Sequence, residues 1–207
     1  MSIKILLVDD HNLVSEGIAR IIISDNKYSV VAQLTNGAEA IEFVKNNPVQ
    51  VVIMDINMPG VDGITATREI KKIVPEIKII GLSMLSDFGT IHKMLESGAD
   101  GYLLKNISGD ELFTALSQVL EGKTYLNTEL QQLFLKGMRD QKNIPLLTKK
   151  EKEVLNLIAA GLTNKDIAIK LKIGEETIKS HRKNIMSKFD IHNAAELVRF
   201  AIDHQLI

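Results

Sequence analysis

Five charged or polar residues follow short apolar runs in the first half of the chain, and their side chains suit phosphate chemistry. Asp9 and Asp10 come after ILLV, Asp55 after VVIM, Ser83 after IIGL and Lys105 after GYLL. Three carboxylates brought to one place would repel one another, so the group favours binding of a hard divalent cation, for which Mg²⁺ is the natural candidate. A hydroxyl and an ammonium beside them would hold phosphoryl oxygens. The pattern predicts phosphoryl transfer onto Asp55, the nucleophile, assisted by Ser83 and Lys105.

The elements that must position these residues alternate along the first half. We expect strands at Ile3–Val8, Ser29–Leu34, Val51–Met54, Ile77–Leu82 and Gly101–Leu104, and helices at 12–23, 37–46, 63–73, 87–97 and 109–121. Because the strands are almost continuously apolar, they predict a doubly wound α/β fold, with a parallel sheet covered by helices on both faces. Active residues of such sheets gather at the carboxyl ends of the strands, where the five residues lie.

Length and composition restrict the class of protein. The chain has 207 residues, long enough for two domains, and its apolar share of 45% and charged share of 25% are those of a globular protein. It contains no cysteine, which excludes disulfides, thiolate zinc sites and cysteine nucleophiles and fits a reducing compartment such as the cytoplasm. The apolar N-terminal run is too short for a signal-peptide core or a membrane span, so we expect no membrane association.

The second half differs in charge and in periodicity. Residues 1–122 carry 10 basic and 16 acidic side chains, a net of −6, whereas residues 123–207 carry 15 and 10, a net of +5. A basic half suggests a polyanionic partner, although a solvated basic face is the alternative. Apolar residues at helical spacing in residues 123–145 predict a part-helical linker there. From Thr148 the pattern is wholly helical, and the three-residue turn at 172–174 between helices 164–171 and 175–188 is typical of a helix-turn-helix.

The first half resembles the receiver domain of bacterial two-component response regulators. The resemblance covers residues 3–122 and is carried by Asp9-Asp10, by Asp55 in M-D-I-N-M-P-G-x-D-G, and by Ser83, Tyr102 and Lys105. It implies a flavodoxin-like (βα)5 fold with strand order 2-1-3-4-5 and a phosphoryl group that a sensor histidine kinase transfers to Asp55. The implied Mg²⁺ ligands are Asp10, Asp55 and the backbone carbonyl of Asn57, with Asp9 acting through water. Ser83 and Tyr102 match the positions that rearrange on phosphorylation.

The second half resembles the LuxR-type DNA-binding domain, and the two halves together resemble the NarL/FixJ class. This implies a four-helix domain at 146–207, after a receiver at 1–122 and a linker at 123–145. The resemblance assigns base contacts to Lys179, Ser180 and Lys183, and phosphate contacts to the following residues: Asn164, Lys165, Thr177, His181, Arg182 and Lys188. It also implies a homodimer on activation that reads inverted half-sites of double-stranded DNA, with RNA polymerase as a further candidate partner.

Two alternatives compete with a phosphorylation-dependent transcriptional regulator, whose only catalysis would be its own phosphorylation and dephosphorylation. A Mg²⁺-dependent phosphatase of the haloacid-dehalogenase type also uses a strand-end aspartate, but it requires a second aspartate where this chain has Asn57. The second alternative is a regulator that binds DNA whether or not it is phosphorylated. The complete set of Asp9, Asp10, Ser83 and Lys105 argues against it.

Overall fold

The computed structural model describes residues 2–142, 145–204 and 206–207, and the chain divides into two compact units. The first unit is Met1–Leu135 and the second is Lys136–Ile207. This division falls inside a helix, α6 (Thr128–Lys142), rather than in a loop. The domain bounds expected from the sequence remain predictions. No helix within the described residues is both long enough and apolar enough to cross a membrane.

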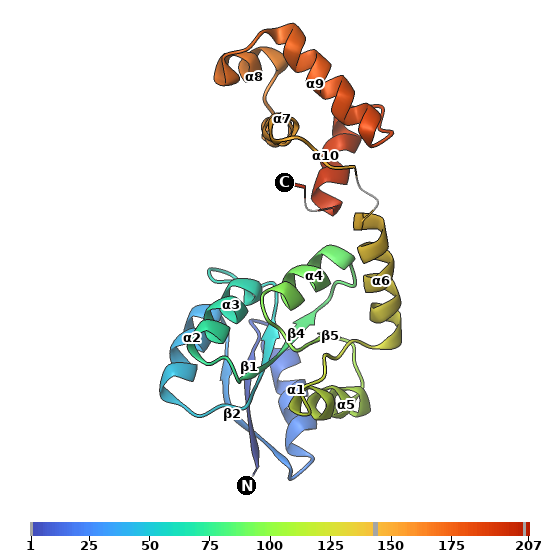
Figure 1. The fold of residues 1–207 in the computed structure, drawn as a ribbon. Coiled ribbons are helices and arrows are strands. Elements are labelled where there is room, and N and C mark those ends of the chain that lie inside the picture. The colour runs from blue at the N-terminus through green and yellow to red at the C-terminus, as the bar shows by residue number, and fades with distance from the viewer. Residues whose placement is uncertain (1, 143–144, 205) are drawn as a thin grey trace. The chain divides into compact units, whose positions relative to one another are not determined.

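The first unit is a parallel five-stranded sheet with the order β2-β1-β3-β4-β5, which confirms the predicted topology (Figure 1). Its strands are β1 (Ile3–Val8), β2 (Tyr28–Leu34), β3 (Val51–Asp55), β4 (Lys78–Ser83) and β5 (Gly101–Leu104). Every residue of β3 is buried, because this central strand has a strand on each side and helices over both faces. Asp55 and Ser83 are the last residues of their strands, so the rigid sheet fixes their backbone positions.

Helices cover both faces of the sheet (Figure 1). They are α1 (Asn12–Ile23), α2 (Gly37–Asn46), α3 (Gly63–Ile73), α4 (Phe88–Glu96) and α5 (Gly109–Leu120). One core lies between the sheet and α2, α3 and α4, and the other lies between the sheet and α1 and α5. Alternating side chains of β1, β3, β4 and β5 enter one core or the other, as expected when each face of a strand is buried.

The start of α6 belongs to the first core. Leu130 is 1% exposed there, and Phe134 packs against Phe88 of α4 with 5.6 Å between the ring centroids. Just before the helix, Tyr125 forms a bridge with Gly101 at the edge of β5. The segment expected to be a part-helical linker therefore contributes ordered structure to the first unit.

The second unit contains the four expected helices, α7 (Lys149–Ala159), α8 (Asn164–Leu171), α9 (Glu175–Lys188) and α10 (Ala194–Asp203). Capping boxes at Thr148 and Thr163 start α7 and α8 by satisfying their first backbone N–H groups. The chain leaves α8 through Lys172 in the left-handed conformation, which permits the sharp turn into α9. Ile178 and Ile185 anchor α9 in the core, so its opposite face is left for solvent or a partner.

Candidate functional site

The predicted charged residues meet at the carboxyl edge of the sheet. Lys105, after β5, donates hydrogen bonds to Asp9 Oδ1 at 2.9 Å and to Asp55 Oδ2 at 2.7 Å. These three side chains are only 2–4% exposed. A buried ammonium thus bridges two buried carboxylates that come from neighbouring strands, β1 and β3. The convergence follows from parallel pairing, which brings the strands' carboxyl ends to one edge.

Burial and charge oppose each other in this group. Burial raises the pKa of Asp55, and the charge of Asp9 adds to the rise, while the Lys105 hydrogen bond acts the other way. For Lys105, burial disfavours the ammonium, but its hydrogen bonds and attraction to Asp55 and Asp9 outweigh burial and raise its pKa. Lys105 therefore stays charged, and one ammonium faces more carboxylates than it can neutralise.

The carboxylate oxygens fit a divalent cation. Asp9 Oδ2 and Asp10 Oδ1 are buried without a hydrogen-bond partner among the described residues. Asp9, Asp10, His11 and Asp55 each offer a ligand atom, and these atoms lie within 4.8 Å of one another. Unpaired buried carboxylate oxygens are costly unless a cation joins them, and oxygen ligands suit Mg²⁺.

Asn57 lies in the exposed turn after β3, and its backbone N–H donates to Asp55 Oδ1 at 3.3 Å. Gly63 lies at the far end of this turn and packs against the backbone of Asp55. Only glycine fits there, because a Cβ would lie 2.0 Å from the Asp55 carbonyl oxygen. No role for Gly63 was predicted from the sequence. Its place in the D-G pair was visible in the sequence, but its contact with β3 was not.

Ser83 and Tyr102 are both fully buried and both bind the backbone of Leu85. Ser83 Oγ accepts from Leu85 N at 3.0 Å, and the Tyr102 hydroxyl donates to Leu85 O at 2.6 Å. Burial raises the pKa of Tyr102 to about 12, so it remains a donor at neutral pH. The two residues expected to move together are thus joined through one loop residue.

In the second unit, α9 presents most of the side chains expected to contact DNA. Lys179, Ser180, Lys183 and Thr177 are exposed along it, whereas His181 is half-buried. Cations on a helix that can enter the major groove are suited to contacts with bases and phosphates. The structure therefore leaves the predicted base-reading positions accessible.

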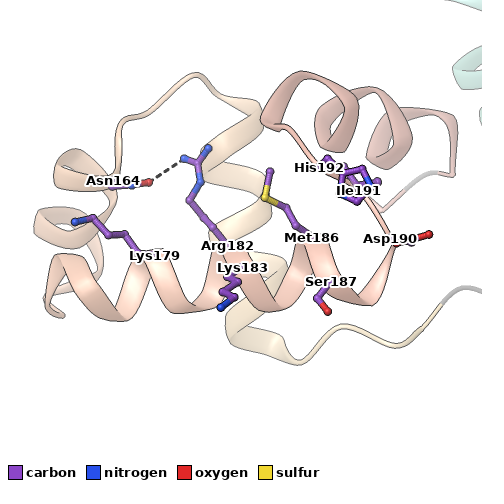
Figure 2. A pocket seen from close by; sticks show the side chains of 9 residues that line it. All are labelled: Asn164, Lys179, Arg182, Lys183, Met186, Ser187, Asp190, Ile191 and His192. Atoms are coloured by element: carbon purple, nitrogen blue, oxygen red, sulfur yellow. Dashed lines mark hydrogen bonds between the residues drawn. The ribbon is translucent and has the colours of Figure 1, made fainter.

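Arg182 and Asn164 connect α9 to the start of α8. Arg182 donates a hydrogen bond to Asn164 Oδ1 at 2.9 Å, and both side chains are half-buried (Figure 2). They line a hollow of about 510 Å³, together with the following residues: Lys179, Lys183, Met186, Ser187, Asp190, Ile191 and His192. Lys165, the next residue along α8, is exposed. Ser187 follows Lys183 by one helical turn, so helical spacing could have predicted that it lies beside Lys183. His192 lies beyond the end of α9, and nothing in the sequence indicated that it lines this hollow.

Lys188 is positioned differently from the other predicted contacts. Its ammonium donates to Glu151 Oε2 at 2.7 Å, and Glu151 is 5% exposed. The Lys188 hydrogen bond, despite the opposing effect of burial, lowers the pKa of Glu151. Lys188 therefore ties α9 to α7 inside the unit, and its predicted phosphate contact has less support than those of Lys179 and Lys183.

Both halves match known families. Residues 5–117 match the response regulator receiver domain, and residues 145–201 match the bacterial regulatory proteins of the luxR family. The chain is 36% identical over 214 residues to the oxygen regulatory protein NreC of Staphylococcus haemolyticus, with 99% of each chain covered. The chain is a response regulator of the NarL/FixJ class.

Other relatives of this response regulator agree along its length. It is 33% identical over 215 residues to the transcriptional regulatory protein DegU of Brevibacillus brevis, covering 95% of this chain and 91% of that protein. The structure of RcsB from Salmonella enterica serovar Typhimurium, bound to a promoter with a phosphomimetic, has a TM-score of 0.73 and 29% identity over 98% of this chain and 99% of that one. The response regulator is thus a transcriptional regulator rather than a phosphatase of the haloacid-dehalogenase type.

Proposed function

We propose that the receiver half accepts a phosphoryl group on Asp55 from a sensor histidine kinase. The observation that carries this proposal is the buried Asp55 carboxylate, held 2.7 Å from Lys105 Nζ beside carboxylate oxygens that have no hydrogen-bond partner among the described residues. Such a group has one ammonium in place and oxygen ligands free for a cation, which is the charge arrangement that an incoming phosphoryl group requires.

In the proposed reaction, an Asp55 carboxylate oxygen attacks the phosphorus. A new O–P bond forms while the N–P bond to the kinase histidine breaks, and the electron pair of that bond returns to the histidine nitrogen. Lys105 turns from a carboxylate to a phosphoryl oxygen without moving far, since it already lies against Asp55. Its charge offsets the negative charge that the phosphoryl group brings to a buried position.

Mg²⁺ is the proposed cofactor, with Asp10, Asp55 and the Asn57 carbonyl as ligands and Asp9 acting through water. When bound, it supplies positive charge to the phosphoryl oxygens. The orphaned oxygens of Asp9 and Asp10 support this ligand set.

Phosphorylation is proposed to act through Leu85. Ser83 Oγ accepts a hydrogen bond from Leu85 N, and the Tyr102 hydroxyl donates to the carbonyl of the same residue, so movement of Ser83 towards a phosphoryl oxygen would draw on Leu85. A shift of Leu85 therefore alters Ser83 and Tyr102 together. This is a two-state device in which the phosphoryl group favours one state by its contacts.

The output half is proposed to bind inverted half-sites of double-stranded DNA as a homodimer, in the cytoplasm, with RNA polymerase as a further partner. Lys179, Ser180 and Lys183 would contact bases, and Asn164, Lys165, Thr177, His181 and Arg182 would contact phosphates. Exposure of α9 opposite Ile178 and Ile185 supports this arrangement. RcsB dimers are described bound to DNA, which is the precedent for a dimeric complex.

The phosphoryl transfer is tested by labelling the full chain with a small phosphodonor and Mg²⁺. Asp55→Asn should abolish labelling, whereas Asp110→Asn, which changes an exposed carboxylate on α5, should leave it intact. Labelling of the Asp55→Asn protein at the normal rate would refute the assignment. Equal DNA affinity before and after labelling would instead favour a regulator that ignores phosphorylation.

The DNA contacts are tested by titrating specific and random duplexes. Lys179→Ala should weaken specific binding by about 1–3 kcal/mol and random binding less, if the lysine reads a base. Lys170→Ala removes an exposed charge from α8 outside the proposed contact set and serves as the control. An equal loss on both duplexes would reassign Lys179 to phosphate binding.

A further inference from the structure

His11 places an imidazole nitrogen among the acidic residues at the sheet edge. Its Nδ1 lies 2.9 Å from Asp10 Oδ1, 3.3 Å from Asp9 Oδ1 and 3.8 Å from Asp55 Oδ2. The Mg²⁺ ligand set proposed above consists of oxygen atoms and leaves His11 without a role. The imidazole is 63% exposed, so it closes the solvent side of a site whose other members are largely buried.

The short approach to Asp10 is not explained by a hydrogen bond. Although Nδ1 lies within ion-pair distance of Asp10 Oδ1, that oxygen has no hydrogen-bond partner of suitable geometry among the described residues. On another side, Lys105 Nζ lies 3.4 Å from Nδ1. In the tautomer whose Nδ1 carries the lone pair, this contact is a hydrogen bond from Lys105, and the same tautomer can bind a metal.

The distances from His11 Nδ1 to the carboxylate oxygens suit ligation of a shared cation. An octahedral ion with bonds of about 2.1 Å separates neighbouring ligand atoms by about 3 Å and opposite ones by about 4.2 Å. The separations from Nδ1 to Asp10 Oδ1, 2.9 Å, and to Asp55 Oδ2, 3.8 Å, fall just below and between these limits. In addition, Asp9 is 3% exposed and its Oδ2 has no partner in the described part of the chain, which is independent evidence that a ligand belongs here.

We propose that His11 Nδ1 is a ligand at this site, and that it shifts the metal preference of the site towards transition-metal dications such as Co²⁺ relative to Mg²⁺. The inference rests on the metal site of the proposed function. Imidazole adds little to the binding of Mg²⁺, which prefers oxygen, but it strengthens binding of first-row transition metals. His11 is thus a residue that sets metal selectivity rather than one that phosphoryl transfer requires.

Direct ligation is tested with Mn²⁺ bound to the full chain, by electron spin echo spectroscopy. Coupling to an imidazole ¹⁴N should be present, should disappear in His11→Ala and should persist in His192→Ala, which removes an exposed histidine of the second unit. The His11 side chain makes no capping hydrogen bond to α1, so its removal should not disturb that helix. A His11→Gln variant, checked by circular dichroism, separates loss of the nitrogen from loss of folding.

Selectivity is tested by titration calorimetry with Co²⁺ and with Mg²⁺. His11→Ala should lower Co²⁺ affinity by about tenfold or more, a loss that even the outer partners of metal ligands can cause, and should change Mg²⁺ affinity much less. If His11 instead competes with cations, its removal will raise the affinity for both metals and no ¹⁴N coupling will be seen, which overturns the inference. Asp10→Asn separates the two proposals. If Asp10→Asn weakens binding of both metals but no ¹⁴N coupling is seen in the unmodified chain, only the role of His11 is refuted. If Asp10→Asn leaves the affinity for both metals unchanged, the metal site itself is refuted.

Discussion

Replacing Lys105 by methionine tests how the buried charges are balanced. The substitution keeps most of the side-chain volume but removes the ammonium that lies 2.9 Å from Asp9 Oδ1 and 2.7 Å from Asp55 Oδ2. Since all three side chains are at most 4% exposed, water screens them little. Removing one partner of a buried ion pair costs about 3–5 kcal/mol, which corresponds to a fall of about 2 M in the urea midpoint of a small domain.

The loss should depend on pH in a defined direction. Without Lys105, burial and the neighbouring charge of Asp9 hold the pKa of Asp55 above that of the unfolded chain, so the folded receiver binds this proton more tightly than the unfolded one. Destabilisation therefore grows as pH rises above the ordinary carboxyl value of 3.8 and fades as pH falls towards it. Mg²⁺ should restore part of the lost stability at neutral pH, because it supplies the missing positive charge.

Tyrosine fluorescence in the full chain measures this unfolding selectively. The chain has three tyrosines and no tryptophan, and Tyr28, Tyr102 and Tyr125 all belong to the first unit. Lys72→Met, which breaks an exposed ion pair with Glu69, is the control and should change the midpoint little. A loss below about 1 kcal/mol for Lys105→Met at pH 8, or an equal loss at pH 8 and pH 5, would refute the reasoning.

Three other substitutions test separate features. Gly63→Ala should destabilise the first unit by about 3 kcal/mol, because its Cβ would overlap the Asp55 carbonyl, while Gly17→Ala, with no described atom within 4 Å of its Cβ, should be tolerated in the same urea titration. Tyr102→Phe should cost about 1 kcal/mol by removing the bond to Leu85 O, and an absorbance titration should lose the tyrosine that ionises near pH 12. Glu151→Gln should cost the second unit about 1–2 kcal/mol at neutral pH, as followed by circular dichroism. Since the Glu151 pKa is lowered, this cost should disappear on acidification below 4.5, and a cost that persists there would mean that packing rather than charge is lost.

The sheet and its charged edge were predictable because local pattern and general topology agree. Apolar runs located the strands, and parallel pairing then required Asp9, Asp55 and Lys105 to meet. The ends of the strands were predicted less accurately. β3 and β4 each end one residue later than expected, which places Asp55 and Ser83 within the sheet. The roles of these residues remain predictions, since the geometry alone does not test them.

Contacts between distant segments that do not follow from the sheet topology were not predictable. Periodicity indicated a helix in 123–145, but not that Leu130 would enter the receiver core. The resemblance assigned Lys188 a phosphate contact, yet its ammonium binds Glu151, which lies 37 residues earlier and beyond the reach of helical spacing. His11 directly follows the acidic pair, so its proximity could have been expected. Its contact with Lys105, which is 94 residues away, could not be read from local spacing.

The position of the unit boundary inside α6 also has an evolutionary consequence. A gene fusion that joined this receiver to another output domain at Gly122 would discard Tyr125 and Leu130, and so expose the edge of β5 and part of the core. A fusion after Leu135 would keep both. Exchange of output domains among relatives should therefore preserve the first half of α6 with the receiver, so that the inherited module is longer than the (βα)5 fold.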